Sequence, residues 1–188
     1  MLRNVVFLDR DGVINQDSAD YIKGWSDFDF ISRSVEAVGD LTRSGFTTIV
    51  ITNQSAIART LISAQELEYV HSKMKEAIES KGGKINDIFI CPHLPSDGCD
   101  CRKPSPGLIY QAQRKYDIDL AASVMIGDSV RDIQCALNAG CGHSILVRTG
   151  NGNDAEHLLT EAGLFTDYVA EDLYDASQWL LNKKKGRI

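Results

Sequence analysis

Short, continuous apolar runs alternate with amphipathic stretches along this chain of 188 residues, and this alternation constrains the fold more than any other feature. Continuous apolar runs are typical of parallel strands that are covered on both faces. The expected strands are 5–8, 48–51, 88–91, 124–126 and 145–147. Their alternation with helical segments predicts an α/β fold built on a doubly wound parallel sheet.

Helical spacing and capping residues mark the segments between these strands. Leu67, Val70, Met74 and Ile78 recur at helical spacing and are expected in the core, behind a capping box that opens at Ser63. Ser105 followed by Pro106 predicts an N-cap and a proline in the first helical position. Further helices are expected around Val38, Ile133, Leu158 and Leu180.

Length and charge limit the classes of function. The length predicts a single domain over residues 1–188, with the cysteine-rich loop 91–101 inserted after the third strand. The net charge of −6 argues against nucleic acid as a partner, because polyanion binding depends on a basic surface. No apolar segment is long enough to span a bilayer, and the start of the chain lacks a signal-peptide pattern. We therefore expect a monomer in the cytoplasm that acts on a small molecule.

Polar groups follow four of the expected strands. They are Asp9-x-Asp11-Gly12, Thr52-Asn53, Arg102-Lys103 after the cysteine-rich loop, and Gly127-Asp128-Ser129 with Asp132 one helical turn further on. Ligands of open α/β sheets bind outside the carboxyl ends of the strands, where all four groups are expected. Each piece alone is also explained by a turn, a surface pair or a helix cap, whereas the ordered combination indicates a site.

The combination is typical of phosphoryl-transfer chemistry. Asp9 is the expected nucleophile, and Asp11, one residue further on, is the expected proton donor and acceptor. Two carboxylates this close need a cation or a proton between them. A Mg²⁺ ion is expected on the carboxylates of Asp9 and Asp128 and the backbone carbonyl of Asp11. The Thr52 hydroxyl and the Lys103 ammonium are expected to hold the phosphoryl oxygens.

Three of the five cysteines crowd into one segment with a histidine. Cys91-x-His93 and Cys99-x-Cys101 provide the four ligands of a closed Cys₃His site, which predicts a structural Zn²⁺ ion. This ion would fix the backbone from which Arg102 and the next lysine project toward substrate. The remaining cysteines and histidines are expected to be ordinary packing, helix or loop residues: Cys135, Cys141, His71, His143 and His157.

The chain resembles phosphatases of the haloacid dehalogenase (HAD) superfamily, whose four motifs match the polar groups above. Within it, residues 4–150 resemble the D-glycero-D-manno-heptose 1,7-bisphosphate phosphatase family, which is similar to the histidinol-phosphate phosphatase domain. The resemblance implies a minimal-cap fold and removal of the C7 phosphate of the heptose bisphosphate, in the ADP-heptose branch of lipopolysaccharide core synthesis. The alternative is a histidinol-phosphate phosphatase of histidine biosynthesis.

Loops at the sheet edge carry the more specific resemblance. The segment from Asp17 to Tyr21, the loop 54–59 and the segment 147–150 resemble the heptose phosphatases. The implied substrate-binding residues are Asp17, Tyr21, Asn53, Gln54, Ser55 and Arg102. Ala56 and Thr60 replace two glycines of the family pattern, and Ser129 replaces a lysine.

Three other classes compete with a phosphatase. A receiver domain would carry its acceptor aspartate after the third strand, where this chain has the cysteine-rich loop. A zinc-dependent nucleic-acid-binding module conflicts with the negative charge. A catalytically inactive binding protein remains open on any fold, although every residue that the chemistry needs is present.

Overall fold

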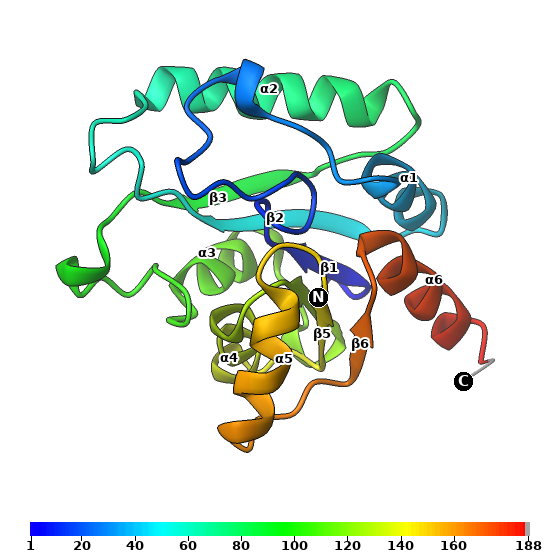
Figure 1. Ribbon diagram of the computed structural model, residues 1–188. Coiled ribbons are helices and arrows are strands. Elements are labelled where there is room, and N and C mark those ends of the chain that lie inside the picture. The colour runs from blue at the N-terminus through cyan, green and yellow to red at the C-terminus, as the bar shows by residue number, and fades with distance from the viewer. Residues whose placement is uncertain (187–188) are drawn as a thin grey trace.

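The predicted doubly wound sheet is confirmed as a six-stranded, all-parallel sheet in the order β3-β2-β1-β4-β5-β6 (Figure 1). The computed structural model describes residues 1–186, so the last two residues of the predicted domain lie outside it. The strands are β1 (Val5–Leu8), β2 (Thr47–Asn53), β3 (Asp87–Cys91), β4 (Val124–Gly127), β5 (His143–Val147) and β6 (Tyr168–Ala170). The sixth strand, which has only three residues, was not predicted.

Helices cover both faces of the sheet. They are α1 (Ser34–Arg43), α2 (Ala64–Glu79), α3 (Gly107–Tyr116), α4 (Val130–Ala139), α5 (Gly152–Glu161) and α6 (Leu173–Lys184), with short 3₁₀ turns at Trp25–Asp27, Pro95–Asp97 and Leu120–Ala122. Helices α1, α2 and α6 lie on one face, and α3, α4 and α5 on the other (Figure 1). Within residues 1–186, none of these helices has the length and apolar character that crossing a membrane requires.

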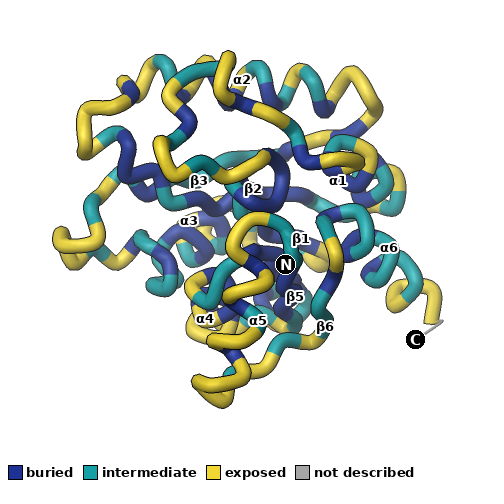
Figure 2. Tube along the Cα trace, viewed as in Figure 1, coloured by how far each residue is buried: buried dark blue, intermediate teal, exposed yellow. Residues whose placement is uncertain are grey.

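Alternation along the strands builds two separate cores. Val6 and Leu8 of β1 pack with α1, α2 and α6, whereas Val5 and Phe7 pack with α3 and α4. Successive side chains of a strand point to opposite faces, so a strand covered on both sides needs apolar residues at every position. The sheet is accordingly the most buried part of the molecule, and the exposed residues lie on helices and loops (Figure 2).

The predicted helix starts are confirmed for α2 and wrong by one residue for α3. The Ser63 hydroxyl accepts a hydrogen bond from the Glu66 N–H, as an N-cap does. Helix α3 instead begins at Gly107, with Pro106 as its N-cap. A Cβ atom at Gly107 would lie 2.3 Å from the Asp100 carbonyl oxygen, so the first turn packs directly on the backbone of the cysteine-rich loop.

The register of the central strands brings the predicted polar groups together. Leu8, the last residue of β1, pairs with Val50 of β2 and Ile126 of β4. The residues that follow Leu8, Val50 and Ile126 therefore lie at the same edge of the sheet, and Asp9 is in the middle of this edge. Because β2 continues through Asn53, Thr52 lies on the strand and not after it.

Candidate active site

A pocket of about 300 Å³ opens at the carboxyl edge of the sheet. Each residue predicted to bind phosphate, sugar or magnesium lines it: Asp9, Asp11, Asp17, Tyr21, Thr52, Asn53, Gln54, Ser55, Arg102, Lys103 and Asp128. The structure thus brings together residues from four segments of the chain that are up to 119 positions apart in the sequence.

Lys103 lies between two carboxylates at the floor of this pocket. Its Nζ is 2.9 Å from Oδ2 of Asp9 and 2.6 Å from Oδ1 of Asp132. Lys103 and Asp132 are almost fully buried, with 2% and 0% of their side chains exposed. Burial alone would lower the pKa of Lys103, but Asp132 and Asp9 raise it above its ordinary value, so the ammonium stays charged.

The Asp9 carboxylate lies directly after β1, and a backbone N–H fixes its orientation. Its Oδ1 accepts a hydrogen bond of 2.7 Å from the Arg10 backbone N–H. Burial raises the pKa of Asp9 to about 7; Lys103 opposes this increase, and Asp132 and Asp128 add to it. A carboxylate in such surroundings gains from a divalent cation, which would favour the ionised form.

Asp128 is the second buried carboxylate on the same side of the pocket. Its Oδ2 accepts hydrogen bonds from the backbone N–H (2.8 Å) and the side-chain amide (3.1 Å) of Asn151. Burial and the neighbouring Asp132 raise the pKa of Asp128 to about 6, although Asn151 opposes the increase. Gly12 and Gly150 make room for it, because a Cβ atom at either position would lie 2.2 Å from its Oδ2.

These carboxylates fit a divalent cation. One oxygen each from Asp9, Asp128 and Asp132 lies within 4.8 Å of the others. Hard cations such as Mg²⁺ take oxygen ligands of this kind. The side chain of Asp11 is not in this group.

The Asp11 carboxylate is stabilised by the guanidinium of the neighbouring Arg10. Both of its oxygens accept hydrogen bonds from the Arg10 guanidinium, at 2.7 and 2.9 Å from Nη2 and 3.1 Å from Nε. Asn15 and Gln54 donate to it as well, at 2.9 and 2.8 Å. Burial opposes ionisation, but the Arg10 charge and these hydrogen bonds lower the pKa of Asp11 below its ordinary value. A cation or a proton was expected between Asp9 and Asp11, and for Asp11 the structure provides the Arg10 guanidinium as a cation.

Residues of β2 and its following loop arrange the opposite wall. The Gln54 amide donates to the Thr52 hydroxyl (2.9 Å) as well as to Asp11, so it joins the two groups. The Asn53 amide accepts from the Lys103 backbone N–H at 3.1 Å and donates to its carbonyl at 3.3 Å. Asn53 was predicted to bind substrate, and in the structure it holds the backbone that carries Lys103.

The mouth of the pocket carries the predicted specificity residues. Asp17 lies at the exposed rim, where its Oδ2 accepts a hydrogen bond of 3.1 Å from Asn151. Tyr21 packs against the small apolar cluster around Ala56, and Ser55 is buried beside it. Two arginines, Arg102 and Arg131, line both this pocket and the adjoining hollow beside the cysteine-rich loop.

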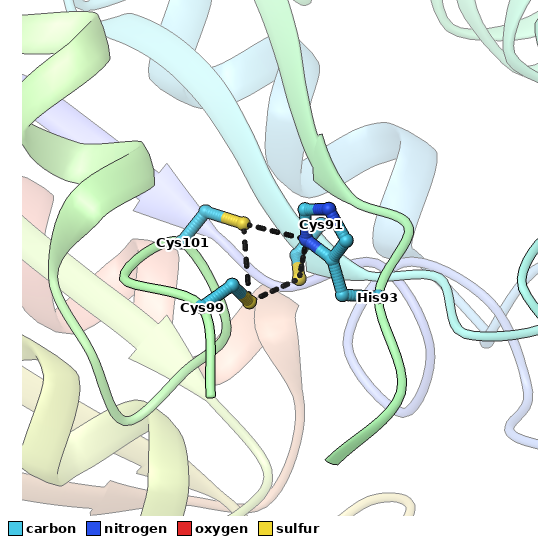
Figure 3. Close-up of side chains that lie close together, drawn as sticks. All are labelled: Cys91, His93, Cys99 and Cys101. Atoms are coloured by element: carbon cyan, nitrogen blue, oxygen red, sulfur yellow. Dashed lines mark hydrogen bonds between the residues drawn. The ribbon is translucent and has the colours of Figure 1, made fainter. Parts of the chain in front are cut away.

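The four zinc-ligand candidates converge on one point (Figure 3). Cys91 Sγ lies 3.6 Å from Cys99 Sγ and 3.7 Å from His93 Nδ1, and Cys101 Sγ lies 3.4 and 3.2 Å from the same two atoms. A tetrahedral ion with Zn–S bonds of about 2.3 Å and a Zn–N bond of about 2.0 Å places its ligands roughly 3.5–3.8 Å apart. The spacing fits zinc and is too long for a disulfide.

The zinc cluster is connected directly to the pocket. Nη1 of Arg102 donates a hydrogen bond of 3.1 Å to the His93 carbonyl, and Arg102 follows Cys101 in the chain. The conformation of Arg102 thus depends on two of the four ligand residues. The positioning of Arg102 by the metal loop stays a prediction, for which this hydrogen bond is the physical basis.

Four charged or amide side chains of the pocket had no assigned function in the sequence analysis: Arg10, Arg131, Asp132 and Asn151. Asp132 lies four positions after Asp128, a helical spacing that places it at the same edge. Asn151 follows the fifth predicted strand, and this position near the carboxyl end of a strand could have indicated that it belongs to the site. Arg10 stands between two aspartates directly after an apolar run, where a buried cation is electrostatically favoured.

Comparison with known proteins places the chain in a family. A family model described as HAD-hydrolase-like matches residues 100–176. The D-glycero-β-D-manno-heptose-1,7-bisphosphate 7-phosphatase of Bordetella bronchiseptica is 42% identical over 180 residues, which cover 95% of this chain and 98% of that protein. The chain belongs to this heptose-bisphosphate phosphatase family. It is accordingly a phosphomonoester hydrolase of the HAD superfamily.

Further comparisons support the membership of the chain in the heptose-bisphosphate phosphatase family. The Pseudomonas aeruginosa protein of the same name is 44% identical over 81% of this chain and 85% of its own length. The crystal structure of the D,D-heptose 1,7-bisphosphate phosphatase from B. bronchiseptica, complexed with magnesium and phosphate, has a TM-score of 0.90 at 42% identity. That comparison covers 96% of this chain and 99% of the solved chain. The expected resemblance to the family is confirmed.

Proposed function

We propose that this chain removes the C7 phosphate of D-glycero-D-manno-heptose 1,7-bisphosphate, in the formation of ADP-heptose for the lipopolysaccharide core. The observation that carries the proposal is Asp9, a partly exposed carboxylate in the pocket, with the Lys103 ammonium 2.9 Å away and Asp128 beside it. The full-length relatives named for this reaction support the choice of substrate.

In the proposed reaction, Asp9 attacks phosphorus, and the bond to the sugar oxygen breaks as the aspartyl-phosphate bond forms. Lys103 and the Thr52 hydroxyl hold the phosphoryl oxygens, where negative charge develops. A Mg²⁺ ion held by Asp9, Asp128 and the Asp11 carbonyl would neutralise further charge on these oxygens. Asp132 keeps Lys103 charged and in place.

Asp11 is the general acid and then the general base in this proposal. Its pKa is low without substrate, and the negative charge of an arriving phosphate favours the protonated form. The protonated carboxyl gives its proton to the leaving sugar oxygen. The resulting carboxylate then takes a proton from the water that hydrolyses the aspartyl-phosphate.

The second phosphate of the substrate needs a second cationic contact. Arg102 and Arg131 are the arginines at the side of the pocket next to the zinc cluster. A guanidinium binds phosphate through two parallel hydrogen bonds, which a lysine cannot do. Histidinol phosphate carries an ammonium group in place of this phosphate and would bring a like charge toward the two arginines.

Kinetics with the two substrates test the proposal. We expect kcat/KM for the heptose bisphosphate to exceed that for histidinol phosphate by at least ~100-fold, or about 2.7 kcal/mol. Arg102→Ala is expected to narrow the difference by weakening the bisphosphate reaction. Arg114→Ala, at an exposed position on α3, is the matched control and should leave the difference unchanged. Equal turnover of histidinol phosphate by the unchanged protein would favour the alternative family.

We also propose that the Cys₃His cluster holds a structural zinc ion and that magnesium is the catalytic ion. Elemental analysis should find about one zinc per chain, retained through a brief chelation that removes magnesium. Cys99→Ser should lower the zinc content and raise KM, because Arg102 is bonded to the same loop. Cys141→Ser, outside the cluster, should change neither. A Cys99→Ser protein that loses zinc but keeps its KM and stability would contradict the positioning of Arg102 by zinc.

A further inference from the structure

The structure contains a buried histidine that the proposed reaction does not use. His71 lies on α2, 61 positions from Arg10, and only 8% of it is exposed. Its Nε2 lies 3.1 Å from Nη1 of Arg10. We propose that His71 is a positioning residue for Asp11 and acts through Arg10. This inference rests on the proposed function, in which Asp11 is the proton donor and acceptor.

The Arg10 guanidinium is buried, and its hydrogen-bond partners hold it in place. It is 1% exposed, and its Nε and Nη2 both bind the Asp11 carboxylate. Within the described part of the chain, Nη1 has no acceptor other than His71. A buried guanidinium N–H without an acceptor loses its solvation without compensation, so removal of the histidine would favour a shift of Arg10.

The chemistry of the pair assigns the direction of this hydrogen bond. Arginine has only donors, so Nε2 of His71 must be the acceptor and must carry no proton. Burial and the Arg10 charge lower the pKa of His71 to about 3, which keeps the imidazole neutral. The acceptor is therefore present at every pH at which the protein is expected to work.

A shift of Arg10 would be transmitted to Asp11. Both Asp11 oxygens are bound to the same guanidinium, so the direction of the carboxyl group follows that of Arg10. Proton transfer to the leaving oxygen requires a donor within hydrogen-bond reach, and small misplacements are costly. The effect of a misplaced Asp11 on the rate depends on the leaving group. An alkoxide must be protonated as it leaves, whereas a resonance-stabilised phenolate leaves without a proton.

The test compares an alkyl phosphate with p-nitrophenyl phosphate. We expect His71→Leu, which has no acceptor, to lower kcat/KM for the alkyl phosphate at least tenfold and for the aryl phosphate less than threefold. His71→Gln, whose amide oxygen can accept from Arg10, should restore the alkyl value to within about threefold of the unchanged protein. The constant kcat/KM is used because it reports the first phosphoryl transfer and not the later hydrolysis.

Two further variants separate positioning from stability. Met74→Ala leaves a cavity on the same buried face of α2, so it should lower the melting temperature but leave the alkyl-to-aryl ratio unchanged. If His71→Leu does not fold, His71→Asn replaces it, because the shorter amide does not reach Arg10. An equal loss for both substrates, or a failure of glutamine to rescue, would overturn the inference. Absence of any phosphatase activity in the unchanged protein would instead contradict the proposed function.

Discussion

Asp9→Asn is expected to abolish phosphate release while the protein remains folded. Asparagine has the size of aspartate but cannot form the aspartyl-phosphate, so kcat should fall by at least ~10⁴-fold. Lys103 keeps its ion pair with Asp132 at 2.6 Å, which preserves the pocket floor. Steady-state phosphate release measures the loss, and the thermal midpoint measures the fold.

A matched substitution at the rim of the pocket is the control for Asp9→Asn. Asp17→Asn makes the same chemical change at an exposed position, so it should alter KM and keep kcat within about tenfold. Acid quenching with a ³²P-labelled substrate should yield a labelled protein for Asp17→Asn and none for Asp9→Asn. If Asp9→Asn retains a tenth of the normal kcat, with deamidation excluded by mass spectrometry, the covalent mechanism is wrong.

Lys103→Met is expected to cause the largest loss of stability. It removes the ammonium from between Asp9 and Asp132 and leaves a fully buried carboxylate without its ion-pair partner. Removal of one partner of a buried ion pair costs about 3–5 kcal/mol of unfolding free energy. Urea denaturation in the presence of a chelator measures this loss without metal at the carboxylates. Activity should be lost as well, because Lys103 faces the transferred phosphate in the proposed reaction.

Two comparisons identify the cause of that loss. The exposed pair Lys73–Glu76, with N and O 2.8 Å apart, is a control, and Lys73→Met should lower the unfolding free energy far less than Lys103→Met. The double variant Lys103→Met/Asp132→Asn removes both charges and should recover at least half of the lost stability. A loss below about 1 kcal/mol for Lys103→Met alone would show that the buried carboxylates do not depend on the lysine.

The positions of Asp9 and Asp128 could be predicted from the sequence because they depend on local signals. Each follows a continuous apolar run, and parallel strands in register bring such positions to one edge. Strand ends were harder to predict, since β2 continues through the polar residues Thr52 and Asn53. Strand β6 gave no clear pattern, because it has three residues and only Ala170 is fully buried.

Partners across the fold could not be predicted in the same way. The sequence places Asp132 near Asp128 but does not indicate that Lys103, on another loop, lies between Asp132 and Asp9. His71 was expected to be an ordinary helix or loop residue, whereas in the structure it is buried on α2 and contacts Arg10, which lies far away in the sequence. Such contacts are set by tertiary packing, not by local spacing.

³¹P NMR of the reaction with D-glycero-D-manno-heptose 1,7-bisphosphate and Mg²⁺ tests the central claim most directly, because the two phosphates give separate signals. The account predicts that the C7 phosphate signal disappears, that inorganic phosphate appears in equal amount, and that the C1 phosphate signal persists. Asp9→Asn should leave both signals unchanged. Loss of the C1 phosphate, or no release at all from the unchanged protein with magnesium present, would contradict the account.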